Sequence, residues 1–240
     1  MFRIAAVAML LPVVGLVAAP VPKDAKGKLP DTDEAVATTE AERAAFKHNS
    51  TGNLKMIGVA VHNFASANQD KLVKNVVDKD GKPLLSWRVE LLPYVEEDAL
   101  YRQFKMDEPW DSPNNIKLLE KMPKIFDSPR VKARKGYTAY QCFTGGGVLG
   151  SRYSIGNIPD GTSNTIWCVE ATATVPWTKP ADMTYDANKE LPKFGKAFAE
   201  KPLALLCDGS VRYLDLKKLS DKTLRNAITP DEGEVLGADW

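Results

Sequence analysis

The fold is decided by LALLCDGSVRY, residues 203–213. Two short runs of apolar and β-branched or aromatic residues flank Asp208-Gly209 in this stretch, and Asp-Gly readily forms the tight turns that join antiparallel strands. The stretch therefore predicts a β-hairpin near the C-terminus.

A helix is predicted far upstream, over about residues 33–68. Its first part is rich in Ala and Glu, and its second part carries Leu54, Ile57, Val61 and Phe64 at spacings of three, four and three. These spacings place the four side chains on one face of a helix, which we expect to be buried. Residues 48–52 are poor helix formers and could divide the helix in two.

Shorter elements fill the rest of the chain. Ser86 can cap a short helix that Pro93 kinks or ends, Asp98 begins another, and residues 114–121 form a third. Strand-like runs rich in β-branched and aromatic residues cover 137–144, 165–171, 203–207 and 211–214. Ser220 caps a last helix, with Leu219 and Leu224 as a hydrophobic staple and Thr229-Pro230 as its stop.

Together these elements predict an α+β fold, in which a long N-terminal helix packs on an antiparallel sheet and short helices are inserted between them. We expect one domain over residues 33–240. Residues 20–32, rich in Pro and Lys, are predicted to be a flexible leader.

Residues 1–19 read as a secretory signal peptide. Arg3 precedes an uncharged apolar run, and the small residues Val17-Ala18-Ala19 suit a signal peptidase, which would cut after Ala18 or slightly downstream. The alternative is an uncleaved membrane anchor, although the prolines in this segment disfavour a spanning helix. The protein is thus expected outside the cytoplasm, in the periplasm or at the cell surface, with membrane contact only if the signal is uncleaved.

The composition excludes some partners. The chain has 32 Lys and Arg residues against 31 Asp and Glu residues, so it lacks the basic surplus that drives nucleic-acid binding. It contains three cysteines, each in a strand-like apolar run. Buried thiols are favoured over a disulfide, which an exported protein could form between two of them. The three are Cys142, Cys168 and Cys207.

Five ordered motifs resemble a bacterial family. They are NLKMIGVAVHNF at 53–64, SWRVELLPYVE at 86–96, WDSPNN at 110–115, DGTSNT at 160–165 and DGSVR at 208–212. On these motifs the chain resembles the pseudopilin-like proteins of domain-of-unknown-function family 1559, from about Asn53 to the C-terminus. The resemblance implies a pilin-like fold and no established activity.

The chain departs from the family pattern in two places. Typical members begin with a prepilin cleavage site and a long apolar assembly helix, where this chain has a Pro-containing secretory signal. Typical members also carry a His ten residues before the Asp-Gly pair, where this chain has Phe198. Assembly into a filament through a shared helical core is therefore not expected.

Two loops hold candidate ligand sites. Asp160 and Asn164 bracket short oxygen-bearing side chains, which fit either a turn with Gly161 at positive φ or a Ca²⁺ site. Asp107, Glu108 and Asp111 surround Trp110, an arrangement that fits a structural loop or a site for a sugar or another small ligand. No cofactor other than calcium is suggested.

Catalytic side chains are scarce. His48 and His62 are the two histidines, and on a continuous helix they would lie roughly 21 Å apart, too far to share a metal. His62 is expected to pack against the sheet with one hydrogen bond. We therefore predict a non-enzymatic structural or interaction protein of the cell envelope, with an unidentified envelope protein as partner. The alternative is an extracytoplasmic solute-binding module, for which carbohydrate is one candidate ligand.

Overall fold

A computed structural model describes residues 39–194, 201–231, 233 and 236–240. The predicted signal peptide, the leader, the first residues of the predicted helix and Phe198 lie outside these ranges. Within them, no helix is both long enough and apolar enough to cross a membrane.

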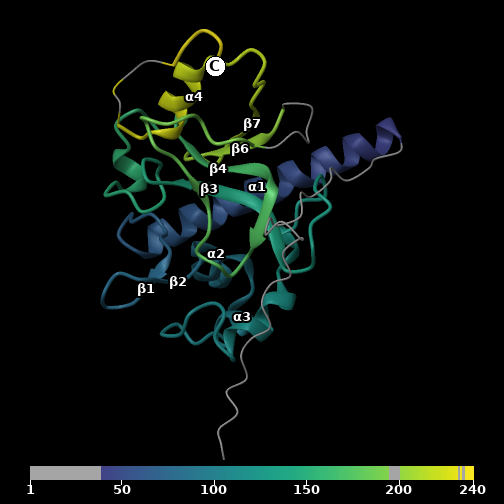
Figure 1. The fold of residues 1–240 in the computed structure, drawn as a ribbon, viewed down its shortest axis with the longest axis vertical. Coiled ribbons are helices and arrows are strands. Elements are labelled where there is room, and N and C mark those ends of the chain that lie inside the picture. The colour runs from purple at the N-terminus through teal and green to yellow at the C-terminus, as the bar shows by residue number, and fades with distance from the viewer. Residues whose placement is uncertain (1–38, 195–200, 232, 234–235) are drawn as a thin grey trace, which may run out of the picture.

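The elements follow in the order helix, short elements, sheet, helix (Figure 1). The α-helices are α1 (Glu40–Ala67), α2 (Trp87–Glu90), α3 (Asp98–Tyr101) and α4 (Asp221–Ile228). The 3-10 helices are η1 (Leu92–Val95), η2 (Asn115–Lys121), η3 (Lys124–Phe126) and η4 (Ile155–Asn157). The strands are β1 (Val76–Val77), β2 (Pro83–Leu85), β3 (Tyr137–Thr144), β4 (Ile166–Pro176), β5 (Met183–Thr184), β6 (Leu203–Leu206) and β7 (Val211–Tyr213).

Helix α1 is continuous through residues 48–52, so the break that the sequence left open does not occur. Thr39 caps it: the Thr39 hydroxyl accepts from the Glu42 N–H, and the Glu42 carboxylate accepts from the Thr39 N–H. The buried side of this helix includes Leu54, Ile57 and Val61, as predicted, while Phe64 is half-buried at the edge of the core. The predicted apolar face is therefore confirmed.

The C-terminal hairpin is present as β6 and β7, with Leu203 opposite Tyr213 and Leu205 opposite Val211. Strand β6 ends at Leu206, one residue earlier than predicted, because Cys207 joins the turn. Residues 207–210 connect the two strands, and among them Gly209 has a φ of +83°, the left-handed conformation that glycine adopts without a steric penalty.

The main sheet has five strands in the order β5-β3-β4-β6-β7. Neighbouring strands are antiparallel except at one edge, where the short β5 pairs parallel with β3. The sheet is thus mixed, where a fully antiparallel one was predicted. A separate pair, β1 with β2, was not predicted at all.

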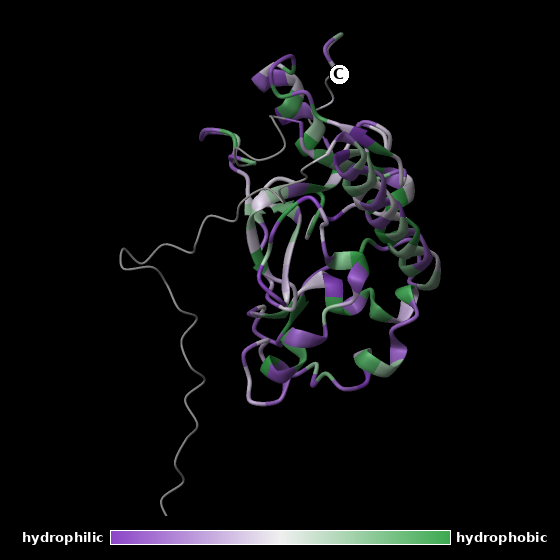
Figure 2. Cartoon of the chain, turned by 90° about the vertical axis from the view of Figure 1, so that its right-hand side faces the viewer, coloured by the Kyte–Doolittle hydropathy of each residue, from purple (hydrophilic) through white to green (hydrophobic). Residues whose placement is uncertain are grey.

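Both faces of the sheet are covered by a hydrophobic core. Helix α1 contacts β6 and β7, and α4 contacts β4 (Figure 1). The long helix also runs beside the sheet in Figure 2, which colours the chain by hydropathy. Side chains alternate between the two faces along each strand. In β6, Leu203 and Leu205 join the core on the α1 side, while Ala204 and Leu206 join the core on the α4 side. This explains why all four residues of β6 are buried.

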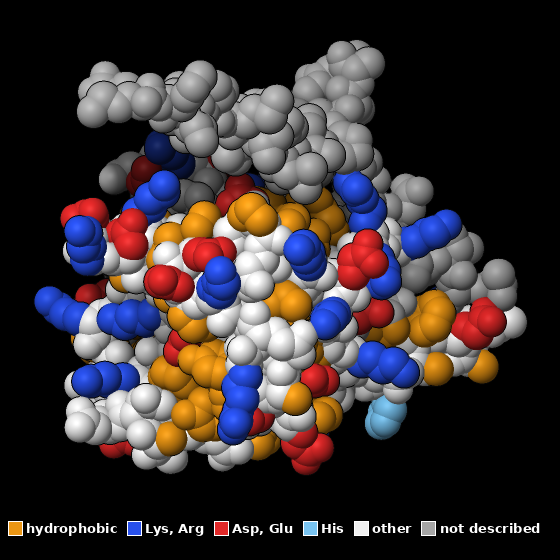
Figure 3. All heavy atoms as spheres, turned by 90° about the horizontal axis from the view of Figure 1, so that it is seen from below, with side chains coloured by type: hydrophobic (Ala, Val, Ile, Leu, Met, Phe, Trp, Pro, Cys, Tyr) orange, Lys and Arg blue, Asp and Glu red, His pale blue; other side chains and the backbone are white. Residues whose placement is uncertain are grey.

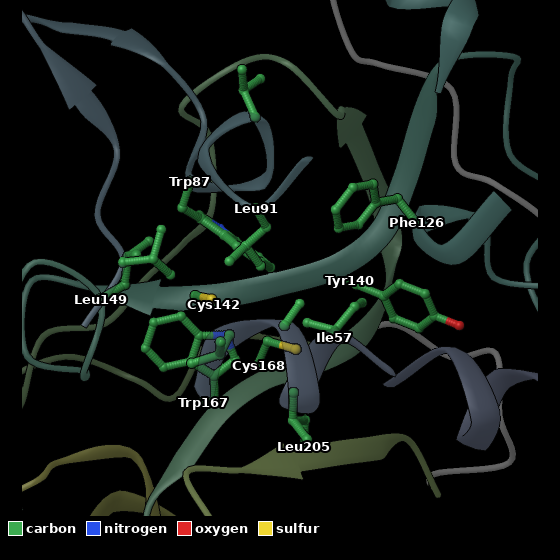
Figure 4. Close-up of a cluster of buried hydrophobic side chains, with 14 of the residues drawn as sticks. Ile57, Trp87, Leu91, Phe126, Tyr140, Cys142, Leu149, Trp167, Cys168 and Leu205 are labelled. Atoms are coloured by element: carbon green, nitrogen blue, oxygen red, sulfur yellow. The ribbon is translucent and has the colours of Figure 1, made fainter. Parts of the chain in front are cut away.

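Figure 4 shows the α1-side core, in which Ile57 of α1 lies among side chains of β3, β4 and β6. Helix and hairpin approach closely at Gly58, where a Cβ atom would lie 3.0 Å from the Leu205 Cδ1 and 3.1 Å from the Gly209 Cα. A larger residue at this position would push α1 away from the hairpin. The central expectation, a late hairpin packed on an early amphipathic helix, is confirmed.

The remaining predicted elements are present with small changes. Ser86 caps α2 through the Arg88 N–H, and Pro93 lies in the first turn of η1, so the helix is interrupted there as expected. The predicted helix over 114–121 is the 3-10 helix η2. Ser220 caps α4 by accepting from the Thr223 N–H, and α4 ends before Thr229-Pro230.

Candidate functional site

The first predicted site forms a hydrogen-bonded turn. The Asn164 side-chain amide donates to the Asp160 carbonyl oxygen at 2.9 Å, and Gly161 has a φ of +88°. The Asp160 carboxylate accepts from the Gly233 N–H at 2.9 Å, which ties the turn to the C-terminal segment. These bonds fit the turn interpretation. The described ranges contain no cluster of three or more His, Cys, Asp or Glu residues placed to hold a metal ion, and calcium binding at the turn stays a prediction.

The carboxylates of the second predicted site, the acidic loop, do not converge on one point. Asp107 and Asp111 are exposed. Glu108 pairs with the Lys105 ammonium at 2.9 Å, and hydrogen bonds from Lys105 and Ser112 lower the pKa of its carboxyl group. Trp110 is half-buried against the core, with the Lys179 ammonium 5.4 Å from its ring centre. Ligand binding by this loop stays a prediction.

Asn115, which was not singled out from the sequence, organises that loop. Its buried side chain accepts from the Lys105 N–H at 3.0 Å and donates to the carbonyl oxygens of Lys105, Glu108 and Pro109 at 2.9–3.1 Å. One side chain therefore replaces the hydrogen bonds that this non-regular backbone cannot make with itself. The role of this Asn in the WDSPNN motif is structural.

Arg88 and Asp182 form a buried ion pair that connects separate segments of the chain. Both side chains are fully buried, and the guanidinium Nη2 lies 2.8 Å from the Asp182 Oδ1. Arg88 also donates to the Tyr140 carbonyl oxygen and to the Ser86 hydroxyl. Burial raises the pKa of the Asp182 carboxyl group, and Arg88 partly opposes that shift. This pair joins α2 to β3 and to the segment before β5.

Glu170 on β4 is the centre of a buried hydrogen-bond network. Its Oε1 accepts from the hydroxyls of Ser50 and Ser128 at 2.5 Å each, and its Oε2 accepts from the Arg130 guanidinium at 2.6 Å. The Ser50 hydroxyl also lies 2.8 Å from the Tyr140 hydroxyl. The network ties α1 to the sheet through a carboxylate whose oxygens are both occupied.

His62 behaves as the sequence predicted. Its Nε2 atom lies 3.0 Å from the Cys207 carbonyl oxygen, so the helix is hydrogen-bonded to the hairpin turn. The ring borders a shallow groove of about 300 Å³ between α1 and Asp208-Gly209. All three cysteines are buried free thiols, as favoured by the sequence. Burial raises the pKa of Cys142 and of Cys207, which disfavours the reactive thiolate.

A larger cleft, of about 560 Å³, opens at the C-terminal end of α1 and contains none of the predicted site residues. Four segments form its walls: the end of α1 with its cap, residues 71–76, α2 and residues 152–154. A bridge between Lys71 and Ser154 joins two of these segments. Its lining residues are Phe64, Asn68, Lys71, Leu72, Lys74, Asn75, Val76, Glu90, Arg152, Tyr153 and Ser154. We call it the Glu90 cleft.

Glu90 is half-buried in this cleft, and burial raises the pKa of its carboxyl group. No side chain in the ranges that the structure describes forms a salt bridge with it. Positively charged Lys71, Lys74 and Arg152 line the same cleft. Both charge signs therefore face one concave surface, which suits binding of a polar or charged solute.

The outward side of α1 offers a different kind of surface. Met56 and Val59, three residues apart, are 59% and 60% exposed. Val59 follows Gly58 in the sequence and borders the groove beside His62, while Met56 lies one helical turn before Val59. We call Met56 and Val59 the α1 outer pair. By contrast, the face in Figure 3 shows Lys and Arg intermixed with Asp and Glu, so no single charge sign dominates that face.

Neither the Glu90 cleft nor the α1 outer pair was identified from the sequence. Glu90 lies within the SWRVELLPYVE motif, but nothing local distinguishes it from an ordinary surface carboxylate. Val59 differs from its buried neighbour Val61 only by its angle around the helix. A systematic search for large apolar residues off the predicted buried face would have found the outer pair.

Residues 40–154 match the model of the family described as "Protein of unknown function (DUF1559)". That description carries no activity. No curated protein and no solved structure matches the chain.

Proposed function

We propose that the protein is an exported, non-enzymatic interaction protein of the cell envelope, whose partner docks on the α1 outer pair. Two observations support this proposal. The polar side chains of the motifs bond to other parts of the same chain, and the apolar side chains of the α1 outer pair are exposed to solvent.

The polar motif residues bind other parts of the same chain. Arg88 holds Asp182, Asn115 holds the backbone of the 105–109 loop, and His62 bonds to the Cys207 carbonyl. A catalytic acid, base or nucleophile must instead reach a substrate. The motifs thus support a fold-maintaining role for these side chains.

The exposed apolar pair carries the interaction proposal. Within the described ranges, the large hydrophobic side chains that are more than half exposed are Met56, Val59 and Val77. Two of these adjoin on a single helix face next to a groove, and apolar surface in this arrangement gains free energy when a partner covers it.

Site-specific photo-crosslinking tests the partner surface. A photoreactive amino acid at Val59 is expected to yield a discrete adduct with one envelope protein in intact cells, identified by mass spectrometry. The same probe at the exposed Lys222 of α4 is the control, because α4 lies on the other side of the sheet. No adduct at Val59, or the same adducts from both positions, would contradict the proposal.

Loss of the surface provides a second test. The double substitution Met56→Asn with Val59→Asn is expected to remove the adduct formed from a probe at the neighbouring Lys55. The free energy of unfolding of the double variant should stay within about 0.5 kcal/mol of the wild-type value, because Met56 and Val59 are both exposed. An unchanged adduct would show that the partner binds elsewhere.

Export is tested separately. N-terminal sequencing of the protein from an extracytoplasmic fraction is expected to show a chain that begins at or just after Ala19. A full-length protein in the cytosol would contradict the envelope role.

Solute binding is the second candidate function, and the Glu90 cleft favours it. The cleft volume of about 560 Å³ falls in the usual range for small-molecule sites, and it combines apolar walls with a few charged groups. A thermal-shift screen against small solutes tests this function, since a ligand of the folded state raises its stability.

A further inference from the structure

Glu90 is the most informative residue of the cleft. A half-buried carboxylate normally recovers its lost hydration from a cation or from hydrogen-bond donors. None of the described side chains supplies a salt bridge, and burial is the cause of its raised pKa. A ligand that brings an ammonium group to this position would compensate the negative charge.

The cations of the cleft keep donors that the described side chains do not use. Lys71 and Lys74 are exposed and form no salt bridge within the described part of the chain. The Arg152 Nη2 atom donates to the Tyr153 hydroxyl and lies 3.9 Å from the Asp231 carboxylate, which leaves the other guanidinium N–H groups for a ligand. Three cations in one cleft favour an anionic group, and a carboxylate is matched well by Lys and Arg donors.

The apolar part of the cleft is built by Phe64, Leu72 and Val76. Phe64 is fixed by an edge-on contact with Tyr94, with ring centres 5.5 Å apart, so this wall is preorganised. A rigid apolar wall gains free energy from burying a hydrocarbon side chain.

We propose that the Glu90 cleft binds a small zwitterionic solute with an apolar side chain, of the amino-acid or short-peptide class. Glu90 receives the ammonium group, Lys71, Lys74 and Arg152 receive the carboxylate, and Phe64 with Leu72 and Val76 contacts the side chain. The inference rests on the second proposed function, solute binding, and names the ligand class for that site.

Isothermal titration calorimetry of the whole protein with free and capped ligands tests the assignment. The probes are L-leucine and leucyl-leucine, each also with an acetylated amine and each also with an amidated carboxylate, and maltose as an uncharged sugar. We expect at least one of the two zwitterions to bind, and either cap on it to weaken binding roughly tenfold or more, because a charge-assisted hydrogen bond is lost. The better of the two zwitterions sets the ligand length.

Two substitutions assign the ends of the ligand. Glu90→Gln is expected to weaken the preferred zwitterion roughly tenfold and to leave its N-acetyl derivative unchanged, with Glu97→Gln as the matched control outside the cleft. Lys74→Gln is expected to weaken the zwitterion while the amidated derivative is unaffected, with the exposed Lys79→Gln as control. Thermal melts of each variant show whether it is folded.

The outcomes separate the ligand class from the function. Equal affinity for capped and free forms, an unaffected Glu90→Gln variant, or binding of maltose alone would overturn the zwitterion assignment and leave solute binding intact. Heat from none of the probes, together with silence in the thermal-shift screen, would overturn both. Neither result bears on the crosslinking test of the α1 outer pair.

Discussion

Replacing Arg88 with Met tests how the fold handles its buried charges. Met retains much of the side-chain volume and removes the guanidinium, which leaves the Asp182 carboxylate buried without its cation. The Asp182 Oδ1 keeps its hydrogen bonds from the Cys142 N–H at 2.9 Å and the Trp87 Nε1 at 3.3 Å, while its Oδ2 has no partner. The Tyr140 carbonyl oxygen loses both of its Arg88 donors.

The expected loss is about 3–5 kcal/mol in the free energy of unfolding at neutral pH, the usual cost when one partner of a buried ion pair is removed. The exposed pair Arg102–Asp98 supplies the matched control, because the side chains are 77% and 54% exposed. Arg102→Met should cost less than about 1 kcal/mol. The difference between the variants isolates the effect of burial.

Urea unfolding followed by tryptophan fluorescence measures both values, provided that the dependence on urea concentration is equal among variants. Adding Asp182→Asn to Arg88→Met should recover part of the loss, because a neutral amide costs less to bury than an unpaired carboxylate. A loss below about 1 kcal/mol for Arg88→Met, or no recovery in the double variant, would refute the reasoning.

The loss should also depend on pH. Burial raises the pKa of Asp182, and removing Arg88 removes the main opposing influence, so the folded variant binds a proton more readily than the unfolded chain. Folded Asp182 then costs stability above its folded pKa, and this cost disappears as the pH falls toward the unfolded value. The destabilisation by Arg88→Met should therefore shrink on acidification; an equal loss at neutral and acid pH would show that Asp182 is not its source.

Other consequences follow from the same structure. Glu90→Gln should raise the thermal midpoint at neutral pH relative to Glu97→Gln, because burial raises the pKa of Glu90 and its ionised form opposes folding; the gain should vanish below the unfolded pKa of about 4.5, and melts at several pH values measure it. Asn115→Ala should lower the free energy of unfolding by about 2–4 kcal/mol, since buried backbone groups lose their partner, and urea titration against the milder Asn114→Ala checks this. An aromatic disulfide reagent should find no reactive thiol in the native protein and three after unfolding; fewer than three would indicate a disulfide among Cys142, Cys168 and Cys207.

Much of the fold was predictable because its signals are local. The Ser220 cap, the Asp208-Gly209 turn and the stripe from Leu54 to Val61 each specify their structure within a few residues. Strands β1, β2 and β5 were missed because two or three residues are too few to show an alternating pattern. The end of β6 was misplaced by one residue because Cys207 is as apolar as the strand before it.

The Glu90 cleft was not predictable because its defining properties are relations between distant segments. Glu90 is half-buried but forms no salt bridge with any described side chain, which its own sequence neighbours do not reveal. Arg152 lines the same cleft from a loop far along the chain. The acidic loop failed as a signal for the opposite reason: closeness in sequence suggested convergence, but Glu108 pairs with Lys105 while Asp107 and Asp111 stay exposed. Carboxylates near one another in sequence form a site only when the backbone turns them toward a common point.

The motifs of this sequence are therefore a guide to the fold more than to the activity. Arg88, Asn115 and His62 each join segments that lack regular hydrogen bonding to one another, so a chain that lost any of them would lose stability before it lost a specific function. Glu90 and Lys74 in the cleft form no salt bridge with any described side chain, and Met56 and Val59 on α1 are exposed, which is why the experiments on function substitute these residues and leave Arg88, Asn115 and His62 unchanged.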